Sequence, residues 1–289
     1  MAAGRAFVLA LLAILFTFPA DSQTPSQTPT PSVKPESEHQ ATQAPVTKRR
    51  RRKASHPAEF QGAGLLQLEY GYNGDFRARD VRAAQTLTLN LNFSLTDTVL
   101  IQFSNDNMAS QTASTGLRQT GLGNTYLGFQ VTTLRETMTR PALAFAYQAT
   151  LPTASEAKGL STVGVWHKTT ALISKKVHDT DIDFNASLLV NGLGHGTGYD
   201  TGAQVAIGFS RDLPNHFGVQ WEVSGQTLDA DEPRGAFASA ALTYQTNARV
   251  QFDAGVRFGL TPAAPRFGAF AGMTIRLANL YHRRGLTEE

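Results

Sequence analysis

The stretch VQFDAGVRFGL, residues 250–260, decides the fold class because apolar and polar residues alternate along its length. A period of two places successive side chains on opposite faces of a β-strand, so this strand has one apolar and one polar face. Residues 267–277, FGAFAGMTIRL, repeat the pattern. A transmembrane β-strand needs about 9–11 residues with this alternation, whereas strands of a soluble β-sandwich average about 5–6 residues. The stretch therefore predicts a barrel whose apolar face contacts lipid.

Similar segments recur upstream, and their apolar positions can be assigned by parity to the lipid side. Only the segment at 163–173 has no clear parity. The predicted strands lie at 66–72, 87–93, 99–103, 127–131, 143–147, 163–173, 182–188, 205–209, 217–223, 238–244, 250–260 and 267–277. Bacterial barrels made from one chain favour an even number of strands. We predict an all-β, antiparallel, up-and-down transmembrane barrel of about 12 strands over residues 61–281.

The connections support this strand count. Such barrels alternate short periplasmic turns with longer external loops. Short connections are expected near Asp97, Arg135, Lys175, Pro214 and Asn247. The alternate connections carry more Gly, Asn, Asp and Pro, at 73–81, 106–120, 152–162, 191–200, 229–234 and 261–265. A missed or invented strand would break this alternation.

The first 22 residues predict a cleaved signal peptide. Arg5 precedes the apolar stretch 6–18, and small residues flank Asp21 before the expected mature start at Gln23. The chain has no cysteine, which excludes a lipid-modified N-terminus and disulfide bonds. We expect the protein in the outer membrane of a Gram-negative-type envelope, in contact with its lipid.

Residues 23–60 predict a disordered linker in the periplasm, because Pro, Thr, Ser and Gln dominate and large apolar side chains are scarce. The basic tract Lys48–Lys53 carries the excess of positive charge, and without it the remaining chain is slightly acidic. A solvated charge run is the favoured interpretation, with binding to lipopolysaccharide or another anionic polymer as the alternative. No aromatic residues interleave with these cations, so no nucleic-acid partner is expected.

Three stretches resemble the MetA-pathway-of-phenol-degradation family of outer-membrane barrels. They are GLGNTYLGF at 121–129, the segment 141–145 running into 151–153, and DAGVRFGLT at 253–261. The resemblance covers residues 62–277, and it implies an outer-membrane barrel with a passive transport role. The family name records a genetic association with the breakdown of aromatic compounds, and the family supplies no catalytic residues.

The C-terminus departs from the usual ending of such barrels. Outer-membrane barrels commonly stop at an aromatic residue, whereas this chain continues past Tyr281 as the extension 282–289. How the assembly machinery recognises this C-terminus is therefore an open question.

Motifs for catalysis and metal binding are weak. The glycines at 121 and 123 lead into a strand and are not followed by the Lys-Ser/Thr pair of a phosphate-binding loop. The seven histidines show no metal-ligand spacing, so no metal or cofactor is expected. A membrane hydrolase would need a serine beside a histidine, but His167, well inside a predicted strand, neighbours Lys168 and Thr169.

The predicted inner face is rich in amides and small residues and carries a few charges. The candidate lumen-lining residues are Glu69, Lys168, Asp183, Glu222, Asp253, Arg257 and Arg276. These charges could form pairs that fill and rigidify a narrow lumen, or they could select permeants. Asp253 and Arg257 lie about 13 Å apart along one strand, so each must find a partner across neighbouring strands or face water. Parity also predicts that arginine at Val256 disturbs folding more than alanine or glutamine at Arg257.

These observations favour a passive channel for small molecules, aromatic or apolar ones among them. One alternative is a non-conducting structural or surface-interaction barrel whose own side chains plug the lumen. A third hypothesis is an outer-membrane lipid hydrolase, which the missing serine partner disfavours. The residues do not indicate the permeant or the oligomeric state.

Overall fold

The computed structural model describes residues 54–60, 62–78, 81–162, 164–192, 198–230 and 232–281. The chain divides into two units, residues 1–44 and 45–289, and every described residue belongs to the second. The predicted signal peptide, the linker up to residue 53 and the extension 282–289 lie outside the described residues. No helix within the described ranges is long and apolar enough to cross a membrane.

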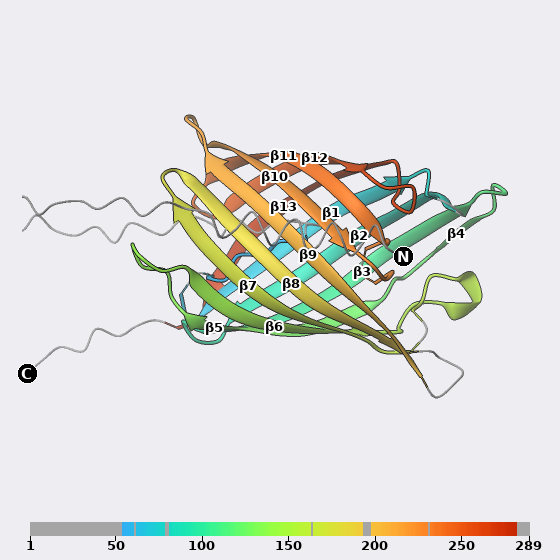
Figure 1. The fold of residues 1–289 in the computed structure, drawn as a ribbon, viewed down its shortest axis with the longest axis horizontal. Coiled ribbons are helices and arrows are strands. Elements are labelled where there is room, and N and C mark those ends of the chain that lie inside the picture. The colour runs from blue at the N-terminus through green and yellow to red at the C-terminus, as the bar shows by residue number, and fades with distance from the viewer. Residues whose placement is uncertain are drawn as a thin grey trace, which may run out of the picture. The chain divides into compact units, whose positions relative to one another are not determined.

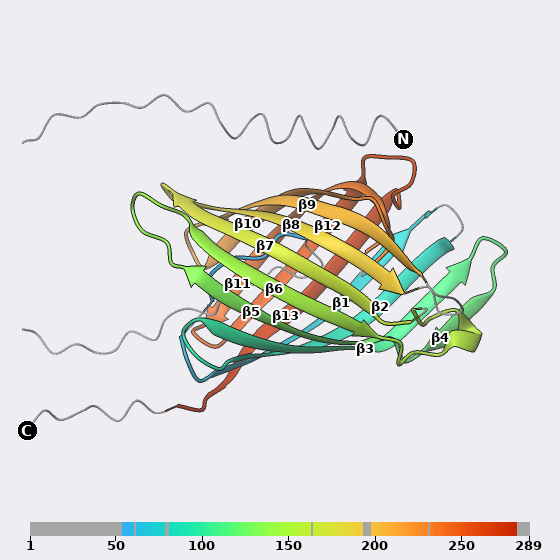
Figure 2. The ribbon, with the colours of Figure 1, turned by 60° about the horizontal axis from the view of Figure 1, so that its bottom comes forward.

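The described part of the chain is built from β-strands (Figures 1 and 2). Their bounds are β1 Leu65–Phe76, β2 Val81–Ser94, β3 Val99–Ala113, β4 Arg118–Gly121, β5 Thr125–Leu134, β6 Ala142–Leu151, β7 Trp166–Val177, β8 Thr180–Gly192, β9 Tyr199–Asp212, β10 Phe217–Gln226, β11 Gly235–Asn247, β12 Val250–Gly259 and β13 Phe267–Asn279. A single turn of 3-10 helix, η2 Glu156–Lys158, lies between β6 and β7.

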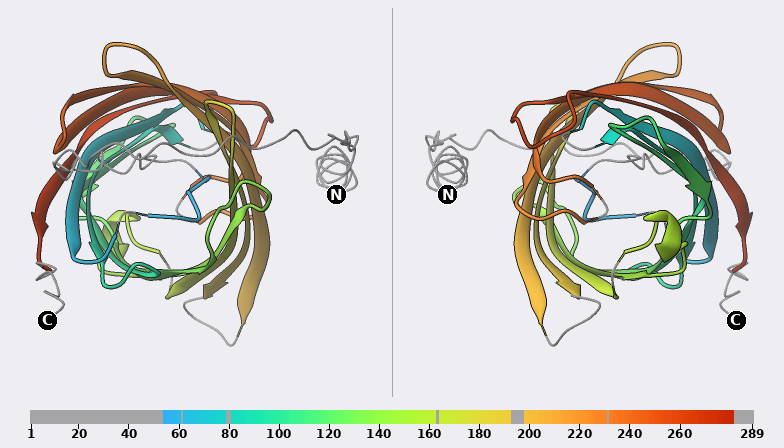
Figure 3. Two further views of the ribbon diagram at one scale, coloured as in Figure 1. Left: turned by 90° about the vertical axis from the view of Figure 1, so that its left-hand side faces the viewer. Right: turned by 90° about the vertical axis from the view of Figure 1, so that its right-hand side faces the viewer.

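The strands form one closed antiparallel sheet. Apart from β4 and β5, strands that follow one another along the chain pair with each other, and β1 pairs with both β2 and β13. The short β4 and the long β5 pair with different parts of β3, so they share one position in the wall. The described residues thus form a twelve-strand closed barrel, seen end-on in Figure 3, and the predicted fold class is confirmed.

The two faces of the wall follow the predicted parity. On β12 the outward Phe252 and Phe258 are 46% and 51% exposed, whereas the inward Gln251 and Arg257 are each 5% exposed. The other strands repeat this arrangement, with most large apolar side chains outside and amides, hydroxyls and charges inside. A few large apolar side chains are buried on the inner face, namely Leu100, Leu172, Leu189, Phe237 and Phe270. The alternation therefore separates an apolar exterior from a polar lumen.

The structure resolves the parity of the ambiguous sixth segment. Strand β7 places Ala171 and Ile173 on the outer face, with Thr170 and Leu172 buried on the inner face. This strand also extends past Lys175, where a turn was predicted, and the connection to β8 lies at 178–179.

Two of the predicted loops are shorter than expected. Strand β1 continues to Phe76, and β3 continues to Ala113 and pairs with β4. The prediction was wrong there because stretches rich in Asp and Asn have the composition of loops. Inside a barrel such residues can lie on the inner face of a strand, where their polar groups bind one another. As a result Asp75 and Asp106 belong to the wall.

The connections define two ends of the barrel. The turn end carries the connections 95–98, 135–141, 178–179, 213–216 and 248–249. The loop end carries 77–80, 114–124 with β4, 152–165, 193–198, 227–234 and 260–266. The predicted alternation of shorter and longer connections is therefore present, apart from the similar lengths of a few of them.

Candidate functional site

The lumen of the barrel contains a piece of its own chain. Residues 54–60, here called the lumen segment, cross the interior of the ring in Figure 3, where they are blue. Ser55 and Ala58 are fully buried, and Ala54 is 2% exposed. The predicted linker ended at residue 60, so its last residues lie inside the barrel.

One end of the lumen segment is bound by a carboxylate on β10. Glu222 accepts the backbone N–H groups of Ala54 at 3.1 Å and Ser55 at 2.8 Å, and the Ser55 hydroxyl at 2.5 Å. Asn185 on β8 donates its amide to the carbonyl of Ala54 at 3.1 Å. Hydrogen bonds to an ionised carboxylate are about twice as strong as neutral ones, so Glu222 is the main anchor here.

A second anchor lies nearer the turn end. The Ala58 N–H donates to the Ser174 hydroxyl at 2.7 Å, and that hydroxyl donates to Asp183 at 2.6 Å. The Ala58 carbonyl accepts hydrogen bonds from Thr132 at 2.7 Å and Gln130 at 3.1 Å. Strands β5, β7 and β8 therefore hold one backbone position through both its donor and its acceptor.

Replacing Glu222 with glutamine is expected to loosen the lumen segment, because the charged acceptor of three donors is lost. A hydrogen bond to a charged group contributes about 1.5–3 kcal/mol, so amide exchange at Ala54 and Ser55 should accelerate about tenfold to a hundredfold. Hydrogen exchange followed by mass spectrometry of the 54–60 peptide measures this. Asp181→Asn is the control, since it removes a carboxylate at the exposed turn end of β8. Equal exchange in the two variants would contradict the anchoring role.

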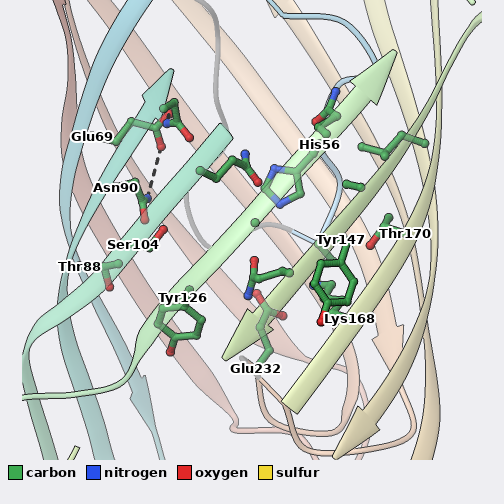
Figure 4. A pocket seen from close by; sticks show the side chains of 18 of the residues that line it. His56, Glu69, Thr88, Asn90, Ser104, Tyr126, Tyr147, Lys168, Thr170 and Glu232 are labelled. Atoms are coloured by element: carbon green, nitrogen blue, oxygen red, sulfur yellow. Dashed lines mark hydrogen bonds between the residues drawn. The ribbon is translucent and has the colours of Figure 1, made fainter. Parts of the chain in front are cut away.

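A cavity of about 240 Å³ lies between the lumen segment and the inner faces of β1, β2, β3, β5, β6 and β7 (Figure 4). Ala54 and His56 border it from the lumen segment, and Glu232 borders it from the connection between β10 and β11. Most of the wall residues carry a hydroxyl, an amide or a charge: Glu69, Thr86, Thr88, Asn90, Asn92, Gln102, Ser104, Asp106, Tyr126, Gln130, Gln148, Lys168 and Thr170. A polar space of this size holds water.

Glu69 is the centre of an amide cluster in the cavity wall. Its carboxylate accepts hydrogen bonds from Gln67 at 3.0 Å, Asn92 at 3.0 Å and Asn90 at 3.4 Å. These donors come from β1 and β2, two neighbouring strands. The side chain is therefore held in position at the edge of the cavity.

Asp106 is a second acidic residue of the wall. It accepts the Thr88 hydroxyl at 2.6 Å and the Tyr126 hydroxyl at 3.0 Å. Sequence reasoning placed Asp106 in a loop, yet it continues the even parity of Gln102 and Ser104 on the same face. Extending the parity beyond the apolar core of the strand would have found it.

Near the loop end, Arg257 joins two acids in a buried ion cluster. Its guanidinium lies 2.6 Å from Asp75 on β1 and 3.1 Å from Glu232. The guanidinium carbon also lies 4.4 Å from the ring centroid of Phe237. Sequence reasoning missed both acids: Asp75 continues the odd parity of β1, whereas nothing in the sequence singles out Glu232.

The structure distributes the seven candidate residues over four groups. Glu69 and Lys168 line the cavity, and Asp183 and Glu222 hold the lumen segment. Arg257 lies in the ion cluster, while Asp253 and Arg276 lie half-buried on β12 and β13. The expectation that Arg257 finds its partners outside its own strand is correct, since both of its acids lie elsewhere.

The outer face around His167 lacks a serine at hydrogen-bonding or register positions. His167 on β7 shares a hydrogen bond of 2.7 Å between its Nδ1 and the Tyr147 hydroxyl, and its register partners are Ala149 and Val190. None of these is a serine. Within the described ranges no group of three His, Cys, Asp or Glu residues could hold a metal ion.

The family model described as "Putative MetA-pathway of phenol degradation" matches residues 51–277. The chain belongs to this family. The match begins a few residues before the lumen segment, so the family pattern includes it together with the strands. No curated protein sequence matches this member of the MetA-pathway family.

Solved structures share the fold of this MetA-pathway protein. An outer membrane channel from Pseudomonas putida F1 is 13% identical with a TM-score of 0.60, covering 75% of this chain and 97% of that one. The NanC porin is 8% identical with a TM-score of 0.50, covering 73% and 100%. LpxR from Salmonella typhimurium is 9% identical with a TM-score of 0.49, covering 73% and 100%. The first two comparisons show that the fold is that of outer-membrane β-barrels.

Proposed function

We propose that this chain is a passive channel for small molecules in the bacterial outer membrane. The permeation path in this proposal is the space between the lumen segment and the wall from β1 to β7. The cavity of about 240 Å³ carries the proposal, because a lumen filled only for stability would pack its side chains without such a space. Membership of the MetA-pathway family and the channel named among its structural neighbours agree with it.

The lining of the cavity bears on the class of permeant. Amides, hydroxyls and charges form most of the wall, so a molecule inside would exchange hydrogen bonds with water for hydrogen bonds with the protein. Aromatic or apolar permeants, which the family name suggests, would meet few apolar partners there. We therefore favour small permeants that carry polar groups.

The proposed orientation follows from the connections. In barrels of this kind short turns face the periplasm and longer loops face outward. The turn end would then be periplasmic, and the linker preceding residue 54 would start on that side of the membrane. The first strand, β1, also begins at the turn end, so the chain would enter the wall from the periplasmic side.

A non-conducting structural barrel is the second candidate. The full burial of Ser55 and Ala58 favours it, since a segment held this tightly also rigidifies the wall. Conductance distinguishes the two candidates, because only a channel carries current through a planar bilayer.

Single cysteines in this cysteine-free chain provide the test. Asn90 lines the cavity, whereas its neighbour Leu89 has the opposite parity and lies on the outer face. We expect the wild type and both variants, Asn90→Cys and Leu89→Cys, to conduct. A water-soluble thiol reagent should reduce the current through Asn90→Cys only. A folded wild type without conductance would instead favour the structural barrel. A reduced current through Leu89→Cys after labelling would contradict the proposed permeation path.

A further inference from the structure

The connection between β10 and β11, residues 227–234, turns inward at the loop end. In Figure 3 this orange segment lies within the ring, and Figure 4 shows Glu232 among the cavity-lining residues. The Glu232 side chain is 8% exposed, although it belongs to a loop. This connection, here called the inner loop, therefore narrows the lumen from the side opposite β2 and β3.

An amide ladder holds the base of the inner loop. Gln226, the last residue of β10, donates its amide to the carbonyls of Leu228, at 2.9 Å, and Glu232. Its own side-chain oxygen accepts the amide of Gln204 at 2.5 Å, and Asn191 donates to the Asp229 carbonyl at 2.5 Å. The base of the loop is thus bound to the inner faces of β8, β9 and β10.

The side chain of Glu232 adds a charged contact to these hydrogen bonds. Glu232 pairs with Arg257, which is fixed independently by Asp75 at 2.6 Å on its other side. The Asp75–Arg257 pair spans β13 at Gly268, where an added Cβ would lie 2.8 Å from the Asp75 carboxylate. Glycine is required there for the close approach of the two side chains. Arg257 therefore stays in place whether or not Glu232 is bound.

We propose that the inner loop is a constriction element of the lumen and that the Arg257–Glu232 ion pair holds it in the inward position. The inference rests on the proposed channel function, since a constriction matters only where molecules pass. Glu232 is the residue that can leave the ion pair. When the loop moves outward, water hydrates the Glu232 carboxylate, while Arg257 remains paired with Asp75. This makes Glu232 a determinant of the size of permeant that the channel admits.

The test compares Glu232→Ala with wild type in the full-length protein. We expect a larger single-channel conductance and faster passage of larger solutes into liposomes. As a separate measure of loop position, a single cysteine at Ala230 should react with a water-soluble thiol reagent about tenfold faster or more in the Glu232→Ala background. Asp179→Ala is the matched control, because it removes the same charge from an exposed pair with Arg211 in a turn-end connection.

The outcomes separate this inference from the channel proposal. Unchanged conductance together with unchanged labelling of Ala230→Cys, in a variant that migrates as a folded barrel, would overturn the constriction. Suppose that Ala230→Cys is labelled faster in the Glu232→Ala background but neither wild type nor variant conducts. That result would support the ion pair as the restraint on the loop and would overturn the channel proposal. Glu232→Asp serves as the rescue variant, since it restores the carboxylate, and it should return both readouts toward wild type.

Discussion

Replacing Arg257 with methionine is expected to lower the free energy of unfolding by about 3–5 kcal/mol, because it removes the cation that two buried carboxylates share. Asp75 and Glu232 both bind the Arg257 guanidinium, and their side chains are 3% and 8% exposed. Methionine preserves much of the volume and the contact with Phe237. Denaturant titration of the protein in lipid vesicles measures the loss.

A triple variant is the control for this prediction. Asp75→Asn and Glu232→Gln, combined with Arg257→Met, replace the whole ion cluster with neutral groups, which is often close to neutral for stability. Recovery of most of the lost stability would assign the effect to the loss of the charge interaction between Arg257 and the two acids. A single variant as stable as wild type would show that the cluster is hydrated. This expectation reverses the one from parity alone, which made Arg257 tolerant of substitution.

Replacing Val256 with arginine is expected to destabilise the barrel by about 2–4 kcal/mol, the penalty for a cation near the bilayer midplane. Val256 lies in the middle of β12 on the outer face, paired with Ala240 and Ala269. Neither neighbour offers a partner for a guanidinium. The same titration in vesicles gives the change in free energy.

Two controls separate charge from size and position. Val256→Ala removes the side chain without adding charge and should cost much less. Asn90→Arg adds the same cation on the inner face, where the cavity has room and Glu69 lies within the same amide cluster. Equal losses for arginine at both positions would mean that the alternation does not separate lipid from lumen.

Parity alone predicted the wall of the barrel. Each predicted strand overlaps an observed one, because a single rule, apolar outward and polar inward, governs every position on a wall that divides lipid from water. Alternation also implied the inward direction of Glu69 and Glu222. It failed where strands extend past the apolar band, at Asp75 and Asp106, since outside the membrane interior the outer face no longer needs apolar residues.

The contents of the lumen could not be predicted in the same way. Ala54, Ser55 and Ala58 are small and lie in a polar stretch that resembles a linker. They are buried because of backbone hydrogen bonds to Glu222, Ser174 and other side chains far along the chain, and such contacts leave no periodic pattern. Glu232 could not be predicted for a similar reason, because it lies in a connection, its partner Arg257 lies on β12, and no sequence spacing relates the two.

The position of the lumen segment has a consequence for the order of folding. Ala54 binds Glu222 across 168 residues of chain, and Ala58 binds Gln130 across 72. These bonds require β5, β7, β8 and β10 to be present, so the lumen segment, which precedes all of these strands in the sequence, is among the last parts to reach its native contacts. A barrel stalled before those strands join would leave the segment without its acceptors. Protection of Ser55 from solvent would therefore report that the wall is complete.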